Sequence, residues 1–165
     1  MLKASSFGEK KLRAFEKIGF FQGEKNVKKS IWIHAVSVGE VNVALKLIQD
    51  LEEILESPNF ILSTTTLTGA RKAKENYSKN LKHVYFPFDL KFICKKFISF
   101  YNPSILLLVE TEIWPNLINV SNEFKLPVVL VNGRLSDKSL KKYQRLSSFF
   151  KESFNKIYHA FVQSK

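Results

Sequence analysis

Apolar, β-rich runs alternate with helical patterns along residues 31–162, and this alternation constrains the fold more than any other feature. The expected strands cover residues 31–36, 60–63, 84–86, 105–109, 128–131 and 157–162. The expected helices between them cover residues 41–55, 68–77, 90–100, 114–124 and 136–154. Strands that alternate with helices pair in parallel, because a right-handed helical crossover returns the chain to the same end of the sheet. The pattern predicts an α/β, Rossmann-like parallel sheet with helices on both faces.

Length and composition agree with one folded domain. The chain has 165 residues, of which 45% are hydrophobic, enough for a core. No stretch approaches the roughly 20 apolar residues of a membrane-spanning helix, and the first residues lack the layout of a signal peptide. The single cysteine, Cys94, excludes a disulfide within the chain and is interpreted as a packed thiol.

The charge of the chain is strongly basic and unevenly distributed. Lys and Arg number 26 and Asp and Glu 15, which gives a net charge of +11 with excesses at both ends. Such a balance favours polyanionic partners, although solvated surface lysines explain it equally well. Residues 1–29 combine basic residues with the short apolar pattern Leu12, Phe15 and Ile18. They are expected to form either a packed helix or a segment that rests on a membrane surface.

Polar residues follow each of the first five expected strands, in segments 37–40, 64–71, 87–89, 110–116 and 132–134. Open parallel sheets bind ligands beyond the carboxyl ends of their strands, so these segments mark the expected site. Glu40 falls at a helix start beside Gly39, which allows a tight turn. Free backbone N–H groups stabilise a carboxylate there, and the same placement suits a general base. Both interpretations of Glu40 stay open at this point.

The other segments offer carboxylates and an anion site. Glu110 and Glu112 are two carboxylates close enough to affect each other's proton affinity. The threonine run that ends at Gly69 offers hydroxyl and N–H groups to an anion at a helix start. Neither a P-loop nor a Gly-x-Gly-x-x-Gly fingerprint is present, so a bound dinucleotide is not expected. Three well-separated histidines lack metal-ligand spacing, so we expect no metal, and His34 is interpreted as a satisfied core histidine.

Five segments together resemble, in order, the signatures of the 3-deoxy-D-manno-octulosonic acid (Kdo) transferases of lipopolysaccharide synthesis. They are residues 32–41, 63–70, 85–89, 109–116 and 131–136, and the resemblance covers about residues 30–165. It implies the N-terminal half of a two-domain GT-B glycosyltransferase, in which a C-terminal domain binds the donor CMP-Kdo. It also implies inverting transfer to a lipid A precursor, without a metal or a further cofactor.

The resemblance assigns roles to individual residues. The catalytic base of the family falls on Glu40, and a second important glutamate falls on Glu110. Substrate-binding roles are expected, from position near the cleft, for Ser37, Gly39, Thr66, Gly69, Arg71, Glu112, Asn132 and Arg134. Residues 30–165 would then form the acceptor-binding domain, preceded by the basic and aromatic helical segment 1–29. Because the donor domain is absent from these residues, this stretch alone is not expected to catalyse transfer.

The expected partners follow from the same resemblance. They are a lipid A precursor, the anionic surface of the bacterial inner membrane on its cytoplasmic face, and the C-terminal donor domain. One alternative is the acceptor domain of another GT-B enzyme, for example one that uses a UDP-sugar. Another is a basic nucleic-acid-binding module, but the sequence lacks such a signature and its aromatic residues sit at core-like positions. Nucleic acid is therefore not an expected partner.

Overall fold

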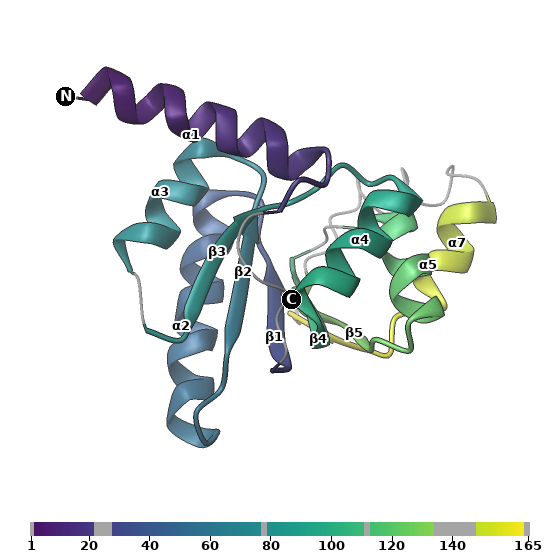
Figure 1. Ribbon diagram of the computed structural model, residues 1–165. Coiled ribbons are helices and arrows are strands. Elements are labelled where there is room, and N and C mark those ends of the chain that lie inside the picture. The colour runs from purple at the N-terminus through teal and green to yellow at the C-terminus, as the bar shows by residue number, and fades with distance from the viewer. Residues whose placement is uncertain (1, 22–27, 77–78, 111–112, 134–147, 164–165) are drawn as a thin grey trace.

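The structure is a computed structural model that describes residues 2–21, 28–76, 79–110, 113–133 and 148–163. A single six-stranded sheet lies between two layers of helices, with strand order β3-β2-β1-β4-β5-β6 (Figure 1). The strands are β1 (Ser30–His34), β2 (Phe60–Thr64), β3 (Leu81–Tyr85), β4 (Pro103–Val109), β5 (Val128–Gly133) and β6 (His159–Val162). The helices are α1 (Leu2–Lys17), α2 (Val38–Ile54), α3 (Leu67–Glu75), α4 (Lys91–Tyr101), α5 (Pro115–Glu123) and α7 (Ser148–Phe154).

All five strand pairings are parallel, which confirms the predicted α/β, Rossmann-like fold class. The chain moves outward from β1 to β3, then crosses back to place β4 on the other side of β1. Ligands of open α/β sheets bind at such a reversal of strand order, beyond the carboxyl ends of the strands. The topology therefore places the expected site above β1 and its neighbours β2 and β4.

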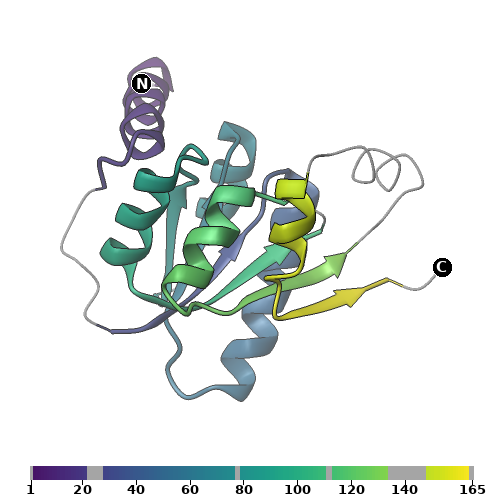
Figure 2. The same ribbon diagram turned by 90° about the vertical axis from the view of Figure 1, so that its right-hand side faces the viewer.

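The core has two halves, one on each face of the sheet. Successive strand residues point to opposite faces, so Trp32 packs beneath α4 and α5 while Ile33 packs beneath α2, and both are fully buried. Figure 2 shows α4, α5 and α7 on the face that is turned to the viewer, with α2 behind the sheet. Strand β4 lies between these layers, which explains the unbroken apolar run at residues 105–109.

Most elements differ from their expected bounds by one to three residues. Strand β3 begins at Leu81 rather than at residue 84, because an edge strand tolerates the half-exposed polar residues Lys82 and His83. Strand β6 begins at His159, two residues later than expected. Of the expected helix 136–154, only α7 lies within the described residues.

Helix α1 packs across the carboxyl end of the sheet beside α3 (Figure 1). The buried carboxylate of Glu16 accepts a hydrogen bond of 2.6 Å from the backbone N–H of Tyr85, at the edge of β3. After the helix, Phe21 packs against the rings of Phe97 and Tyr101 in α4. No helix in the described part of the chain is both long enough and apolar enough to cross a membrane.

Candidate active site

Glu40 is the third residue of α2 and lies on the turn after β1. Ser37 caps the helix, because its hydroxyl accepts a hydrogen bond of 3.2 Å from the backbone N–H of Glu40. In return, the Glu40 carboxylate accepts bonds from the N–H groups of Val36 (2.8 Å) and Ser37 (3.1 Å). The helix-start interpretation is therefore correct, and the Ser-x-x-Glu spacing of this capping box is the local signal that sequence reasoning missed.

The capping box fixes the carboxylate and still leaves it able to accept a proton. The side chain of Glu40 is buried, with 5% of the residue exposed, whereas Ser37 and Gly39 beside it are exposed. Each carboxylate oxygen has two lone pairs, and the two backbone bonds use one on each oxygen. The second lone pair on either oxygen is the one that could receive a substrate proton.

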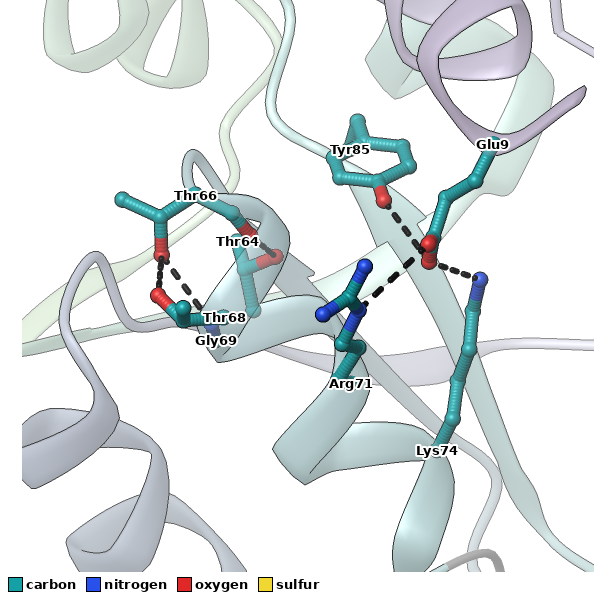
Figure 3. A network of polar contacts seen from close by, with 8 residues as sticks. All are labelled: Glu9, Thr64, Thr66, Thr68, Gly69, Arg71, Lys74 and Tyr85. Carbon is teal, nitrogen blue, oxygen red and sulfur yellow. Dashed lines mark hydrogen bonds and ion pairs between the residues drawn. The ribbon is translucent and has the colours of Figure 1, made fainter. Parts of the chain in front are cut away.

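The turn after β2 is bonded to the turn that holds Glu40. The Thr66 hydroxyl donates to the carbonyl of Val36 (3.1 Å). It also caps α3 by accepting a hydrogen bond from the N–H of Gly69 (3.0 Å), as Figure 3 shows. A Cβ atom at Gly69 would lie 2.9 Å from the Thr66 hydroxyl oxygen, so the packing of this cap against the helix start requires glycine. The structure thus brings Thr66 and Gly69 beside the Glu40 turn.

Arg71 points away from this contact, toward a carboxylate on α1. Its Nε lies 3.8 Å from Glu9, whose carboxylate also accepts from Lys74 (3.0 Å) and from the Tyr85 hydroxyl (3.2 Å) (Figure 3). Burial would raise the pKa of Glu9, but these donors together hold that pKa below its usual value. Sequence reasoning missed Glu9, since 65 residues separate it from Lys74.

Glu110 and Asn132 share an unusual backbone conformation at the carboxyl ends of neighbouring strands. Both have φ of +59°, in the left-handed region that residues with a Cβ enter at a cost of roughly 1–2 kcal/mol. The N–H of Glu110 donates to the carbonyl of Val131 (2.9 Å), so the two positions are adjacent across β4 and β5. Such strain gathers at functional sites. The other two candidates, Glu112 and Arg134, lie outside the described residues.

His34 lies beneath the Glu40 turn and is fully buried. Its Nδ1 is 2.9 Å from the hydroxyl of Ser63, which also accepts a bond of 2.8 Å from the indole N–H of Trp32. Burial lowers the pKa of His34 to about 3, so the ring is neutral at physiological pH. The expectation of a satisfied core histidine holds for Nδ1 only, because the buried Nε2 has no hydrogen-bond partner among the described residues.

The carboxyl edge of the sheet therefore gathers Glu40, Thr66, Glu110 and Asn132 on four adjacent strand ends. Within the described ranges, no three His, Cys, Asp or Glu side chains lie together as metal ligands would. A pocket lined by Lys29, Asn102 and Phe124 lies at the opposite edge of the sheet, away from these residues. The arrangement offers a fixed carboxylate, hydroxyl groups and backbone N–H groups, which suits proton transfer to or from a polar ligand.

Comparison with known proteins gives one consistent family. Residues 12–165 match the model of the 3-deoxy-D-manno-octulosonic-acid transferase (kdotransferase) family. A bifunctional glycosyltransferase/methyltransferase from Fusobacterium nucleatum is 40% identical over 137 residues, which cover 82% of this chain and 21% of that protein. A 3-deoxy-D-manno-octulosonic acid transferase from Haemophilus influenzae is 33% identical over 146 residues, covering 88% of this chain and 34% of the relative.

A plant protein also shows the resemblance. A probable mitochondrial 3-deoxy-D-manno-octulosonic acid transferase from Arabidopsis thaliana is 31% identical over 113 residues, or 68% of this chain and 25% of that protein. The chain thus spans 21% to 34% of the length of these relatives.

Proposed function

This chain belongs to the 3-deoxy-D-manno-octulosonic acid (Kdo) transferase family, and we propose that it forms the acceptor-binding half of an inverting glycosyltransferase of lipopolysaccharide synthesis. The donor would be CMP-Kdo, bound by a C-terminal domain, and the acceptor a lipid A precursor. The observation that carries the proposal is the position of Glu40, whose carboxylate is fixed at the carboxyl edge of the sheet beside the reversal of strand order. Family membership supports the same assignment.

Glu40 acts as the general base in the proposed reaction. Its carboxylate takes the proton from a sugar hydroxyl of the acceptor as that oxygen attacks the anomeric carbon of Kdo. The new carbon–oxygen bond forms on the face opposite CMP, the bond to the phosphate oxygen of CMP breaks, and its electrons leave with CMP. The two backbone bonds hold the carboxylate in place throughout, so no side-chain ordering is required when the acceptor binds.

The acceptor is phosphorylated in this proposal, and the basic surface supplies its counter-charge. Arg71 and Lys74 project from α3 toward Glu9 of α1, and their side chains remain 59% and 45% exposed. Charge-assisted hydrogen bonds from such cations to phosphate are stronger than neutral ones. The net charge of +11 adds a long-range attraction toward anionic lipids.

An exposed apolar surface surrounds the end of α1 and the segment after β3. We name it the aromatic patch, and its members are Phe15, Ile18, Phe20, Phe88, Leu90 and Phe92. Lys17 lies over the ring of Phe88 and Lys96 over the ring of Phe20. Aromatic rings flanked by lysine are typical of surfaces that sit among lipid headgroups. The patch would hold the site against the cytoplasmic face of the inner membrane.

The test of the proposal is the Glu40→Gln variant of the full-length protein. Glutamine is the other residue that completes a capping box, so this variant can keep the bond from the Ser37 N–H and removes the base. Its NH2 group cannot accept the second bond, from the Val36 N–H, so the melting temperature should fall modestly. We expect the rate of Kdo transfer to fall about 100-fold or more, well beyond what this small loss of stability explains.

Glu53→Gln is the matched control, because Glu53 is an exposed glutamate near the far end of the same helix. It should transfer Kdo at the wild-type rate. Near-normal transfer by Glu40→Gln would exclude Glu40 as the base, whereas no transfer by the wild-type protein would exclude the proposed reaction itself.

A further inference from the structure

Helix α5 starts without a cap from its own neighbours. Trp114 occupies the N-cap position and makes no side-chain capping bond, and Pro115 has no N–H group to donate. The next two N–H groups, of Asn116 and Leu117, donate instead to the carboxylate of Asp89, at 3.1 and 2.7 Å. Asp89 follows β3 and lies 27 and 28 residues before its two partners.

The contact between Asp89 and α5 is reciprocal and partly shielded from water. The side-chain amide of Asn116 donates to the backbone carbonyl of Asp89 at 2.7 Å. The ring of Trp114 packs against Phe86, in the same segment as Asp89, with 4.9 Å between ring centroids. Burial raises the pKa of Asp89, and the N–H groups of Asn116 and Leu117 oppose that rise by stabilising the charged form. The segment after β3 thus holds the start of α5 through polar and apolar contacts.

Described residues on either side of the connection from β4 to α5 are held by separate contacts. At the first end, the N–H of Glu110 donates to Val131 in the neighbouring strand. At the second end, Asp89 holds Asn116 and Leu117. Glu110 has a φ of +59°, a conformation that persists only where the surrounding structure over-determines it.

We propose that Asp89 is a positioning residue, which caps α5 from outside that helix and thereby keeps Glu110 in its left-handed conformation at the site. Its importance for transfer rests on the proposed function, whereas its effect on the local backbone does not. An ordinary helix cap would affect global stability alone. A positioning residue must in addition change the backbone of the segment that bears Glu110.

Hydrogen exchange on the full-length protein tests the backbone part of the proposal. In Asp89→Ala, the amides of Glu110, Asn116 and Leu117 should exchange about 10-fold faster, while amides of β2 keep their wild-type rates. Asp89→Asn should lie between, because its single amide oxygen accepts fewer N–H bonds than a carboxylate. Asp50→Asn is the matched control, since Asp50 makes an exposed ion pair with Lys46 on α2, far from the start of α5.

Wild-type exchange at Glu110 in Asp89→Ala would overturn the proposal, as would equal acceleration in Asp50→Asn. Should Asp89→Ala not fold, Asn116→Ala removes the reciprocal bond alone and should accelerate the same amides.

In transfer assays, Asp89→Ala should lower kcat about 10-fold and leave the KM for CMP-Kdo unchanged, with partial rescue in Asp89→Asn. An Asp89→Asn variant as slow as Asp89→Ala, with wild-type exchange, would instead show a direct role of the charge and contradict positioning. If the wild-type protein transfers no Kdo, the proposed function fails while the exchange result stands.

Discussion

The buried, neutral His34 makes stability depend on pH in a way that one substitution should remove. Burial lowers the pKa of His34 to about 3 in the folded protein, against an ordinary value of 6.5. The unfolded chain therefore takes up a proton as the pH falls below 6.5, while the folded chain does not until the pH approaches 3. Stability from this group is fully present above pH 6.5 and is lost progressively below it.

The size of the effect follows from the two pKa values. At pH 5 the unfolded histidine is almost fully protonated and the folded one is not, so the loss is about 1.4 kcal/mol for each of the roughly 1.5 pH units below 6.5, or about 2 kcal/mol. Burial and Lys74 lower the pKa of His83 to about 4, so His83 adds a similar loss. The difference between wild type and His34→Asn isolates the contribution of His34 from this and every other group.

Urea unfolding at pH 7.5 and pH 5.0 measures that difference. Between the two pH values, the wild type should lose about 2 kcal/mol more than His34→Asn, whatever stability the substitution costs at pH 7.5. Equal losses in wild type and His34→Asn would show that His34 is protonated in the folded state, and the reasoning from its burial would then be wrong.

Two further predictions concern the contact between turns and the aromatic patch. Gly69→Ala should lower the free energy of unfolding by about 1–3 kcal/mol in urea titrations, because its Cβ would lie 2.9 Å from the Thr66 hydroxyl and 3.4 Å from the Val36 carbonyl. An unchanged midpoint would mean that the Thr66 hydroxyl is not packed this closely against position 69. Phe92→Ser should weaken co-flotation with anionic phospholipid vesicles about 10-fold or more. The ring of Phe92 is 67% exposed in the protein and would be buried in the lipid, and serine has no such apolar surface to bury. Ile54→Ser, which removes a 77% exposed side chain at the far end of α2, should leave flotation unchanged, and an equal loss in both variants would exclude the patch as the contact surface.

Local patterns predicted the fold because the spacing of apolar and polar residues within short segments determines which segments form strands and which form helices. A strand buried on both faces must be apolar throughout, as residues 105–109 are, and each helix carries one apolar face. Polar segments at the strand ends indicate where the site lies, since the carboxyl ends of parallel strands meet at one edge of the sheet. The capping box of Glu40 was missed, but it is also a local signal, since Ser37 stands three residues before Glu40.

The other contacts that sequence reasoning missed join segments that are distant along the chain. Asp89 reaches the start of α5 across 27 residues, and Glu9 reaches Lys74 across 65. No periodicity or spacing records such pairs, because they depend on how the helices dock on the sheet. The left-handed backbone of Glu110 is hidden for the same reason, since the tertiary structure imposes it against the preference of a residue with a Cβ.

The two glutamates of the proposed site are therefore held by opposite means. The backbone N–H groups of Val36 and Ser37 hold Glu40 in a favourable local motif, so a change in the rest of the domain leaves its carboxylate in place. The position of Glu110 depends instead on contacts at both ends of its segment. A distant change that disturbs the segment after β3, such as a perturbation of the exposed Phe88 or Leu90 beside Asp89, should act on Glu110 long before it acts on Glu40.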